Sequence, residues 1–243
     1  MIAPLIQGIL DTQSNFILAA AGVCLLTAFT LILLMRNADM ATQQQRVYGA
    51  FWVAVVAGVG VWTTHFVAMI GFRPDAMLTY DLRTTAISIF VGIAFVGLPM
   101  AASMFFSERP MRLGLGVAAG LGVTAMHLTG MSALENCLTT YNPLVLGLGI
   151  LGAVGGFTWT MAQEGSETAS TLKRVAGFTG GVCTLHFVAM ASLTLSPFEG
   201  TATGIGGSFL SIMVAVVSLG VLAFAVVATF NYRRTLAMLR VSA

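Results

Sequence analysis

The sequence predicts an all-α protein, a polytopic transmembrane helical bundle of seven spans built as three repeated helical hairpins plus a seventh helix. Two observations predict it. Apolar residues make up 57% of the 243 residues and charged residues only 8%, whereas a soluble domain has about 25% charged residues. The apolar residues also gather in stretches of about 20, the length that crosses a bilayer at a rise of about 1.5 Å per residue.

Seven stretches meet this criterion in order along the chain: 14–35, 47–71, 84–106, 112–134, 143–162, 173–194 and 206–231. Short connections join the first six into hairpins over 14–71, 84–134 and 143–194. The last stretch, 206–231, stands outside the repeat. The connections leave no room for a second domain, so we expect residues 1–243 to form one membrane domain. The start of the chain lacks the pattern of a cleavable signal peptide.

The charge of the connections predicts the orientation of the spans. Nine basic residues lie after the first, third and fifth spans or in the C-terminal tail: Arg36, Arg46, Arg109, Arg112, Lys173, Arg174, Arg233, Arg234 and Arg240. The opposite side has only Arg73 and Arg83. Because basic loops stay in the cytoplasm, we expect the C-terminus inside and the N-terminus outside. The expected surroundings are the lipid bilayer, with no nucleic acid as a partner.

The second, fourth and sixth spans share a motif that includes every histidine of the chain. Its histidines are His65, His127 and His186, each with a glycine five residues earlier. A methionine follows each histidine after four residues, at positions Met69, Met131 and Met190, and the residue before each methionine is small. Ionisable residues inside apolar spans are costly and usually functional. The three histidines are therefore the candidate functional residues.

The three histidines are predicted to lie at similar depth, roughly 10–15 Å below the outer surface at about 1.5 Å per residue. The simplest packing of parallel repeats is a pseudo-threefold bundle with the second, fourth and sixth spans at its centre. Glycines on these spans are expected to let their backbones approach one another. These glycines are Gly58, Gly60, Gly120, Gly122, Gly180 and Gly181.

The donor atoms favour a buried copper site. Imidazole binds copper, zinc, iron and nickel, whereas a thioether is soft and selects copper, above all Cu(I). The predicted metal-binding residues are His65, His127, His186, Met69, Met131 and Met190. Three imidazoles with a methionine lining, or two small sites stacked one helical turn apart, both fit this spacing. The alternatives are zinc, a haem with two axial ligands, or histidines that only hydrogen-bond neighbours such as Thr64 and Thr124.

The remaining polar and sulfur-containing residues carry weaker signals. Cys24 and Cys183 lie inside predicted spans and are expected to be small packing residues. Glu135, Asn136 and Cys137 follow the fourth span, two turns above His127. They are either a metal entry lip with supplementary ligands or an ordinary solvated loop, and we favour the loop.

Around the histidines the chain resembles the MHYT domain, a bacterial integral-membrane sensory module with repeated Met-His-Tyr-Thr-like motifs. The best copy is Met126-His127-Leu128-Thr129, and the others are Thr64-His65-Phe66-Val67 and Leu185-His186-Phe187-Val188. The resemblance covers the first six spans. The tyrosine is replaced in all three copies, and the leading methionine remains only at Met126.

The resemblance implies a sensor in the bacterial cytoplasmic (inner) membrane that binds copper and detects oxygen, carbon monoxide or nitric oxide. It also implies partnership with cytoplasmic cyclic-di-GMP signalling domains or proteins. We expect no enzymatic activity, because no acid–base pocket is evident. A copper or small-molecule transporter or channel is the main alternative, although the inner halves of the motif spans lack the polar ladder that a conduit needs. A haem-binding membrane protein is the other alternative.

Overall fold

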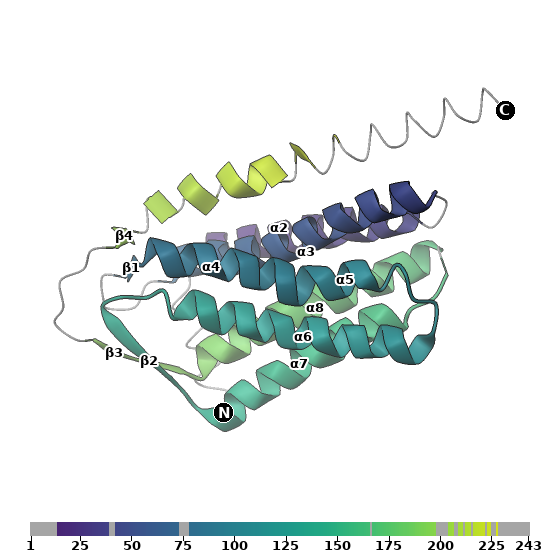
Figure 1. The fold of residues 1–243 in the computed structure, drawn as a ribbon. Helices are drawn as coiled ribbons and strands as arrows, with labels where there is room; N and C mark the ends of the chain where they lie inside the picture. The colour runs from purple at the N-terminus through teal and green to yellow at the C-terminus, as the bar shows by residue number, and fades with distance from the viewer. Residues whose placement is uncertain are drawn as a thin grey trace.

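The computed structural model describes residues 14–38, 42–72, 78–165 and 167–197, and short pieces between 204 and 227. Most of the described chain is helical (Figure 1). The helices are α2 (Ser14–Ala38), α3 (Gln43–Gly71), α4 (Leu82–Gly92), α5 (Leu98–Ala102), α6 (Arg109–Met131), α7 (Pro143–Ala162) and α8 (Thr168–Ala191). A π-helical turn, η1 (Ile93–Gly97), joins α4 to α5 and makes them one continuous segment.

Five helical segments are long and apolar enough to cross a membrane: Asn15–Arg36, Gln43–Gly71, Leu82–Ala102, Arg109–Met131 and Pro143–Ala162. The protein is therefore a multi-pass membrane protein. Helix α8, at the predicted sixth span, is 24 residues long and carries Lys173 and Arg174 in its first two turns. Most of the predicted seventh span, 206–231, lies outside the continuously described residues, where a shorter apolar helix covers Ile212–Val221.

Local sequence signals set where several helices begin. The Thr42 hydroxyl accepts a hydrogen bond from the Gln45 backbone N–H while the Gln45 side chain bonds back to Thr42, a capping box at the start of α3. Asp81 caps α4 through the backbone N–H of Thr84. Asn142 caps α7 directly before Pro143, which occupies the first helical position. Side chains in the short connections thus fix these starts, which precede the predicted ones by four residues in α3 and two in α4 and coincide with the predicted one in α7.

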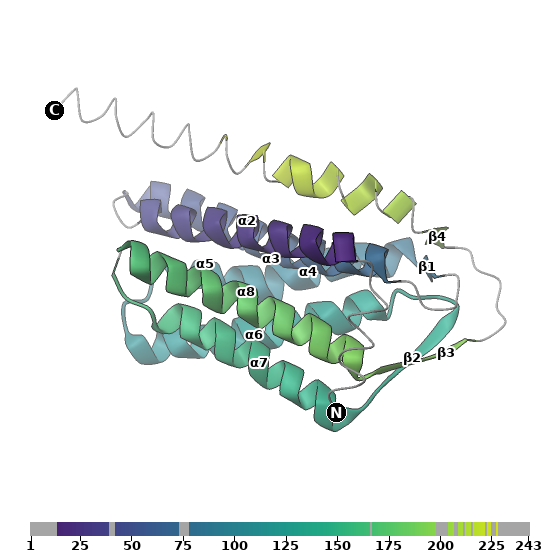
Figure 2. The ribbon, with the colours of Figure 1, turned by 180° about the vertical axis from the view of Figure 1, so that it is seen from behind.

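Three outer helical segments surround three inner helices, and each outer segment packs against two of the inner ones. Helix α2 packs against α3 and α8, the α4–α5 segment packs against α3 and α6, and α7 packs against α6 and α8. Figures 1 and 2 show this alternation from opposite sides. In α3, 83% of the most apolar window is buried, compared with 28% in α7. The motif helices α3, α6 and α8 are therefore inside, and the outer helices turn large apolar side chains such as Leu18, Phe90 and Leu144 outward.

The prediction that the motif glycines let the motif helices approach one another is wrong. A Cβ at Gly58 would lie 2.4 Å from Ile93 of η1, one at Gly122 would lie 2.0 Å from the Phe95 carbonyl oxygen, and one at Gly120 would lie 2.6 Å from Val154 of α7. Gly60 faces Thr27 of α2, and Gly181 faces α7. Gly180 has open space around it. The glycines therefore let each motif helix approach outer helices, and not the other motif helices.

Two small antiparallel sheets lie at the end of the bundle where α3, α6 and α8 finish, which we call the histidine end. Strand β2 (Cys137–Tyr141) pairs with β3 (Leu193–Pro197), and β1 (Thr79–Tyr80) pairs with β4 (Ile205–Gly206). The all-α prediction missed these strands, because each pairs with a segment far away in the sequence and local periodicity does not reveal such partners.

The loop after α6 forms hydrogen bonds to residues in or next to the strands of the smaller sheet. The Glu135 carboxylate accepts hydrogen bonds from the Thr79 hydroxyl (3.3 Å) and from the Gly204 backbone N–H (2.7 Å). The backbone N–H of Glu135 donates to the Thr79 carbonyl oxygen. Glu135 therefore joins the connections at the histidine end to one another, and the loop is neither simply solvated nor aimed at the histidines.

Candidate metal centre

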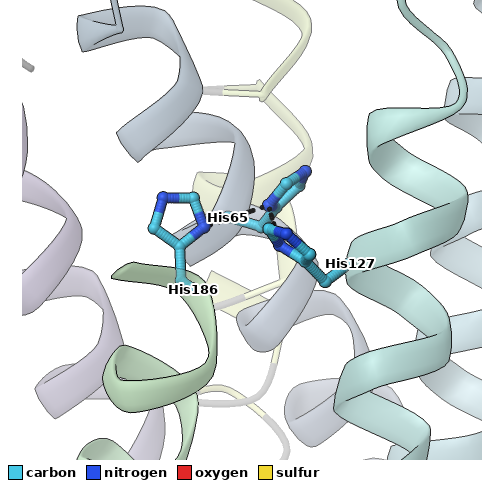
Figure 3. Close-up of side chains that lie close together, drawn as sticks. All are labelled: His65, His127 and His186. Carbon is cyan, nitrogen blue, oxygen red and sulfur yellow. Dashed lines mark hydrogen bonds between the residues drawn. The ribbon is translucent and has the colours of Figure 1, made fainter. Parts of the chain in front are cut away.

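The three motif histidines meet inside the bundle, although 121 residues separate the first from the last along the chain. His65 comes from α3, His127 from α6 and His186 from α8, and Figure 3 shows their rings turned toward one another. The Nδ1 atom of His65 lies 3.1 Å from Nδ1 of His127 and 3.2 Å from Nδ1 of His186. One nitrogen from each ring lies within 4.8 Å of the other two.

The cluster is shielded from the surroundings on all sides. The exposed fractions of His65, His127 and His186 are 3%, 1% and 8%. The rings stand edge-on to one another, and Phe66 and Phe187 each add a T-shaped contact to the preceding histidine. Packing therefore fixes the ring planes, and the two phenylalanines occupy the position that is tyrosine in the MHYT motif.

The neighbouring hydroxyls bond elsewhere. Thr64, Thr124 and Thr129 donate to the carbonyl oxygens of Gly60, Gly120 and Ala125, each four residues earlier in the same helix. Among the described residues, Nε2 of His65 and Nε2 of His127 are buried and have no hydrogen-bond partner. A buried polar atom without a partner is costly. The cluster thus differs from a set of histidines that are satisfied by surrounding threonines.

A glycine makes room for the central ring. A Cβ at Gly130 of α6 would lie 2.7 Å from Nε2 of His65, well inside van der Waals contact. Gly130 is the small residue that comes three positions after His127 in the motif. The small residue of the second motif copy, Gly130, therefore makes space for the histidine of the first copy, His65.

The spacing of the nitrogens suits a single metal ion. Metal–imidazole bonds are about 2.0 Å, so two nitrogens on a tetrahedral ion lie about 3.3 Å apart. The Nδ1 separations from His65 to His127 and to His186, 3.1 and 3.2 Å, are close to this value, and the three ligand nitrogens all lie within 4.8 Å of one another. No carboxylate belongs to the cluster among the described residues. Three neutral nitrogen donors in an apolar interior fit a transition-metal ion and do not fit Ca²⁺ or Mg²⁺, which require oxygen ligands.

The motif methionines are also buried. Met69, Met131 and Met190 have exposed fractions of 2%, 1% and 7% and lie one helical turn beyond the three histidines. Residues four apart share a helix face, which places each thioether on the side of the helix that carries the imidazole. Their participation as ligands is a proposal taken up below.

The cysteines lie apart from the histidine cluster. Cys24 of α2 is fully buried and within hydrogen-bonding reach of Cys183 of α8, in the seam between these two helices. Cys137 begins β2, and burial raises the pKa of its thiol. Burial likewise raises the pKa of Tyr141, at the other end of β2, to about 12. Cys137 therefore stays protonated and is no ready thiolate ligand.

Comparisons with known proteins point to bacterial signalling. The family model described as "MHYT: Bacterial signalling protein N terminal repeat" matches residues 58–118. An uncharacterized signaling protein of Caulobacter vibrioides is 32% identical over 195 residues, which cover 77% of this chain and 24% of the relative. No solved structure matches the chain.

Two relatives from Pseudomonas aeruginosa carry enzyme names. The cyclic di-GMP phosphodiesterase NbdA is 34% identical over 193 residues, 73% of this chain and 24% of the relative. The bifunctional diguanylate cyclase/cyclic di-GMP phosphodiesterase MucR is 32% identical over 220 residues, 84% of this chain and 32% of the relative. The chain thus spans between a quarter and a third of the length of these much longer proteins.

Proposed function

The chain belongs to the MHYT family of bacterial signalling-protein repeats, and from this premise we propose that it is a membrane-embedded sensor whose three buried histidines hold a copper ion. The observation that carries the proposal is the convergence of His65, His127 and His186, with Nδ1 atoms 3.1 and 3.2 Å apart in an apolar interior. A sensory role agrees with the relatives, which are named signalling proteins.

The motif methionines favour copper over zinc in this proposal. Met69, Met131 and Met190 are buried one turn from the histidines, and a thioether is a soft ligand that selects Cu(I). A bound ion would supply a coordination position for a diatomic gas such as oxygen, carbon monoxide or nitric oxide. The residues of the chain hold the imidazoles together and shield them from the surroundings. The three methionines are proposed to supply sulfur ligands on one side of the cluster.

The proposal includes a topology and an output. We propose seven spans, counted from the apolar stretches, with the N-terminus in the periplasm and the C-terminus in the cytoplasm, as the basic residues of the connections indicate. Cyclic-di-GMP enzymes, named among the relatives, are the proposed cytoplasmic partners. The membrane region itself is proposed to have no catalytic activity. Its role is to transmit the state of the histidine cluster along α3, α6 and α8.

The test is metal analysis of the full chain purified into lipid nanodiscs without added metal. We expect copper above zinc and iron, lost in His127→Ala and weakened at least tenfold in Met131→Leu, which removes the sulfur but keeps the volume. Met35→Leu, at the other end of the bundle, is the matched control and should bind like the unaltered protein. Tight zinc without copper would contradict the choice of metal, and the absence of any metal would contradict the site.

A spectroscopic experiment separates sensing from transport. Carbon monoxide added to the reduced, copper-loaded protein should perturb an absorption or vibrational band, and His127→Ala should abolish the change. If no gas alters the spectrum while copper crosses proteoliposomes that contain the protein, the transporter function replaces the sensor.

A further inference from the structure

A second polar site lies at the end of the bundle opposite the histidines. A cavity of about 210 Å³ lies between the last turns of the outer helices α2 and α7, the loop after α5 and the first turns of the motif helices. Its polar lining consists of Arg46, Arg112, Arg174, Ser103, Ser107 and Thr160. We call it the arginine cavity. A space of about 10–15 Å³ on this measure holds one water molecule, so the cavity has room for a polyatomic ligand.

The three arginines come from the same three helices as the histidines. Arg46 precedes His65 by 19 residues on α3, Arg112 precedes His127 by 15 on α6, and Arg174 precedes His186 by 12 on α8. At about 1.5 Å per residue the two sites are roughly 18–29 Å apart along the helix axes. Arg46 and Arg112 are the fourth residues of α3 and α6, so the positive dipole ends of these two helices add to the charge of the guanidinium groups. Arg174 lies in the second turn of α8.

The arginine side chains are held in place by backbone carbonyl groups. Arg112 donates to the carbonyl oxygens of Met161 and Gln163, at 2.5 and 2.7 Å, and Arg174 donates to Gln163 at 2.8 Å. Arg46 donates to the carbonyl oxygen of Met104, and its guanidinium lies 5.6 Å from the centre of the Phe105 ring. These contacts fix the guanidinium groups before any ligand arrives.

Some N–H groups of the arginines remain available after these contacts. A guanidinium has five N–H donors, and the Nε atom of Arg46 is buried without a hydrogen-bond partner among the described residues. No acidic residue lines the arginine cavity among the described residues. Arg112 forms an ion pair with Glu164 at 3.7 Å, and the Glu164 side chain is 66% exposed, so solvent weakens the pair. Fixed guanidinium groups therefore face a cavity whose described lining contains no acidic residue.

We propose that the arginine cavity binds a phosphoryl oxyanion, either a free phosphate group or the phosphodiester headgroup of an anionic lipid. Guanidinium groups match the oxygens of a phosphoryl group with paired, charge-assisted hydrogen bonds. A cation is repelled by the same side chains, and a neutral ligand would make weaker hydrogen bonds to them than an anion does. Because the site is separate from the histidines, this proposal stands whether or not the cluster binds copper.

The test uses the full chain in nanodiscs. The first arm titrates inorganic phosphate and pyrophosphate into phosphatidylcholine nanodiscs at constant ionic strength, with binding followed by ³¹P resonance broadening. The second arm measures, by native mass spectrometry, which lipids stay attached after transfer from nanodiscs of equal phosphatidylcholine and phosphatidylglycerol. Saturable phosphate binding identifies a free phosphate as the ligand. Selective retention of phosphatidylglycerol without phosphate binding identifies the lipid headgroup.

The variants make either result specific. Arg46→Gln and Arg174→Gln should each weaken the observed binding at least tenfold. Arg46→Lys keeps the charge without the paired donors, so it should fold and still lose several-fold in affinity. Arg36→Gln, whose side chain bonds Thr171 and does not line the cavity, is the control and should bind normally. Binding in neither arm, or binding that is equal in Arg46→Lys, Arg174→Gln and the unaltered chain, would overturn the proposal.

Discussion

At the scale of single residues, the histidine cluster depends on a neighbour that contributes no polar atom. His65 is the central ring, since its Nδ1 atom contacts both other histidines. Its opposite edge lies over Gly130, where a Cβ would come within 2.7 Å of Nε2. Any larger residue at position 130 must push the imidazole out of the triangle. The geometry of the site is thus set as much by the size of Gly130 as by the donors themselves.

We therefore expect Gly130→Ala to lower metal affinity at least tenfold while the helices remain folded. The methyl group displaces the His65 ring, but alanine has a higher helix propensity than glycine by about 1 kcal/mol. Metal titration together with circular dichroism measures both effects. Gly114→Ala, on the same helix with open space around it, is the control and should leave affinity unchanged. Equal affinities in the two variants would contradict the role of Gly130.

The convergence of the histidines could be predicted from the sequence, but its supporting residues could not. Three equivalent positions in a repeat of helical hairpins must meet if the repeats surround one axis, and His65, His127 and His186 do so. Gly130 was visible only as a small residue of its own copy, because helix periodicity does not tell which neighbouring helix a residue faces. For the same reason, the sequence shows Arg46, Arg112 and Arg174 as indicators of orientation and does not reveal that they meet in one cavity.

At the scale of elements, the start of α4 is controlled by one side chain. Asp81 accepts hydrogen bonds from the hydroxyl and the backbone N–H of Thr84. These bonds hold the pKa of the Asp81 carboxyl below its ordinary value, with the Thr84 hydroxyl as the largest cause. A lowered pKa in the folded state means that the cap stabilises the protein at neutral pH. This stabilisation declines as the pH falls below the ordinary carboxyl value and is lost below the lowered one.

Asp81→Ala should accordingly reduce stability by about 1 kcal/mol at pH 7, the usual cost of a lost N-cap. Thermal unfolding in detergent at pH 7 and in steps toward pH 3 measures the difference. Asp81→Asn is the informative companion, because asparagine caps a helix as well as aspartate but carries no charge. It should match the unaltered chain at pH 7 and show less loss in acid. An Asp81→Ala variant as stable as the unaltered chain at pH 7 would exclude a capping role.

The π-turn η1 has a cause that is local in sequence. Pro99 has no N–H group to bond the carbonyl oxygen of Phe95, and its ring would collide with that oxygen in a regular α-helix. The freed carbonyl lies against Gly122 of α6, where the absence of a side chain lets the two backbones come this close. The sequence predicts a single span over 84–106, and the structure keeps one continuous segment while changing its winding in the middle.

At the scale of the whole molecule, the spans were the most predictable feature and the sheets the least. A bilayer forces a backbone to satisfy its hydrogen bonds within each segment, so length and apolar composition suffice to find helices such as α2 and α7. The pairing of Cys137–Tyr141 with Leu193–Pro197 depends on how two hairpins are placed side by side. Such placement is a property of the assembled bundle, and no single segment encodes it.

The orientation of the assembled bundle is open to a direct measurement. Reporter fusions at Arg240 should read as cytoplasmic, and fusions within 73–83 should read as periplasmic, because the basic residues are concentrated on the C-terminal side. A paired phosphatase and fluorescent-protein reporter at each position provides the internal control, since only one of the two is active on each side. The opposite pattern would place the histidines near the cytoplasm and the arginine cavity at the periplasmic surface.

The π-turn also limits how far the repeat symmetry extends. A π-turn adds about one residue to a helical turn, so α5 is out of phase with α4 by about 100°. The outer helices α2 and α7 have no such turn. A threefold rotation that superposes α4 on them therefore cannot also superpose α5. Near-equivalent surroundings at one end of the bundle suit a single small ion. The broken equivalence at the other end makes one outer side of the bundle different from the other two, so a ligand or partner that binds at that end meets a surface without threefold symmetry.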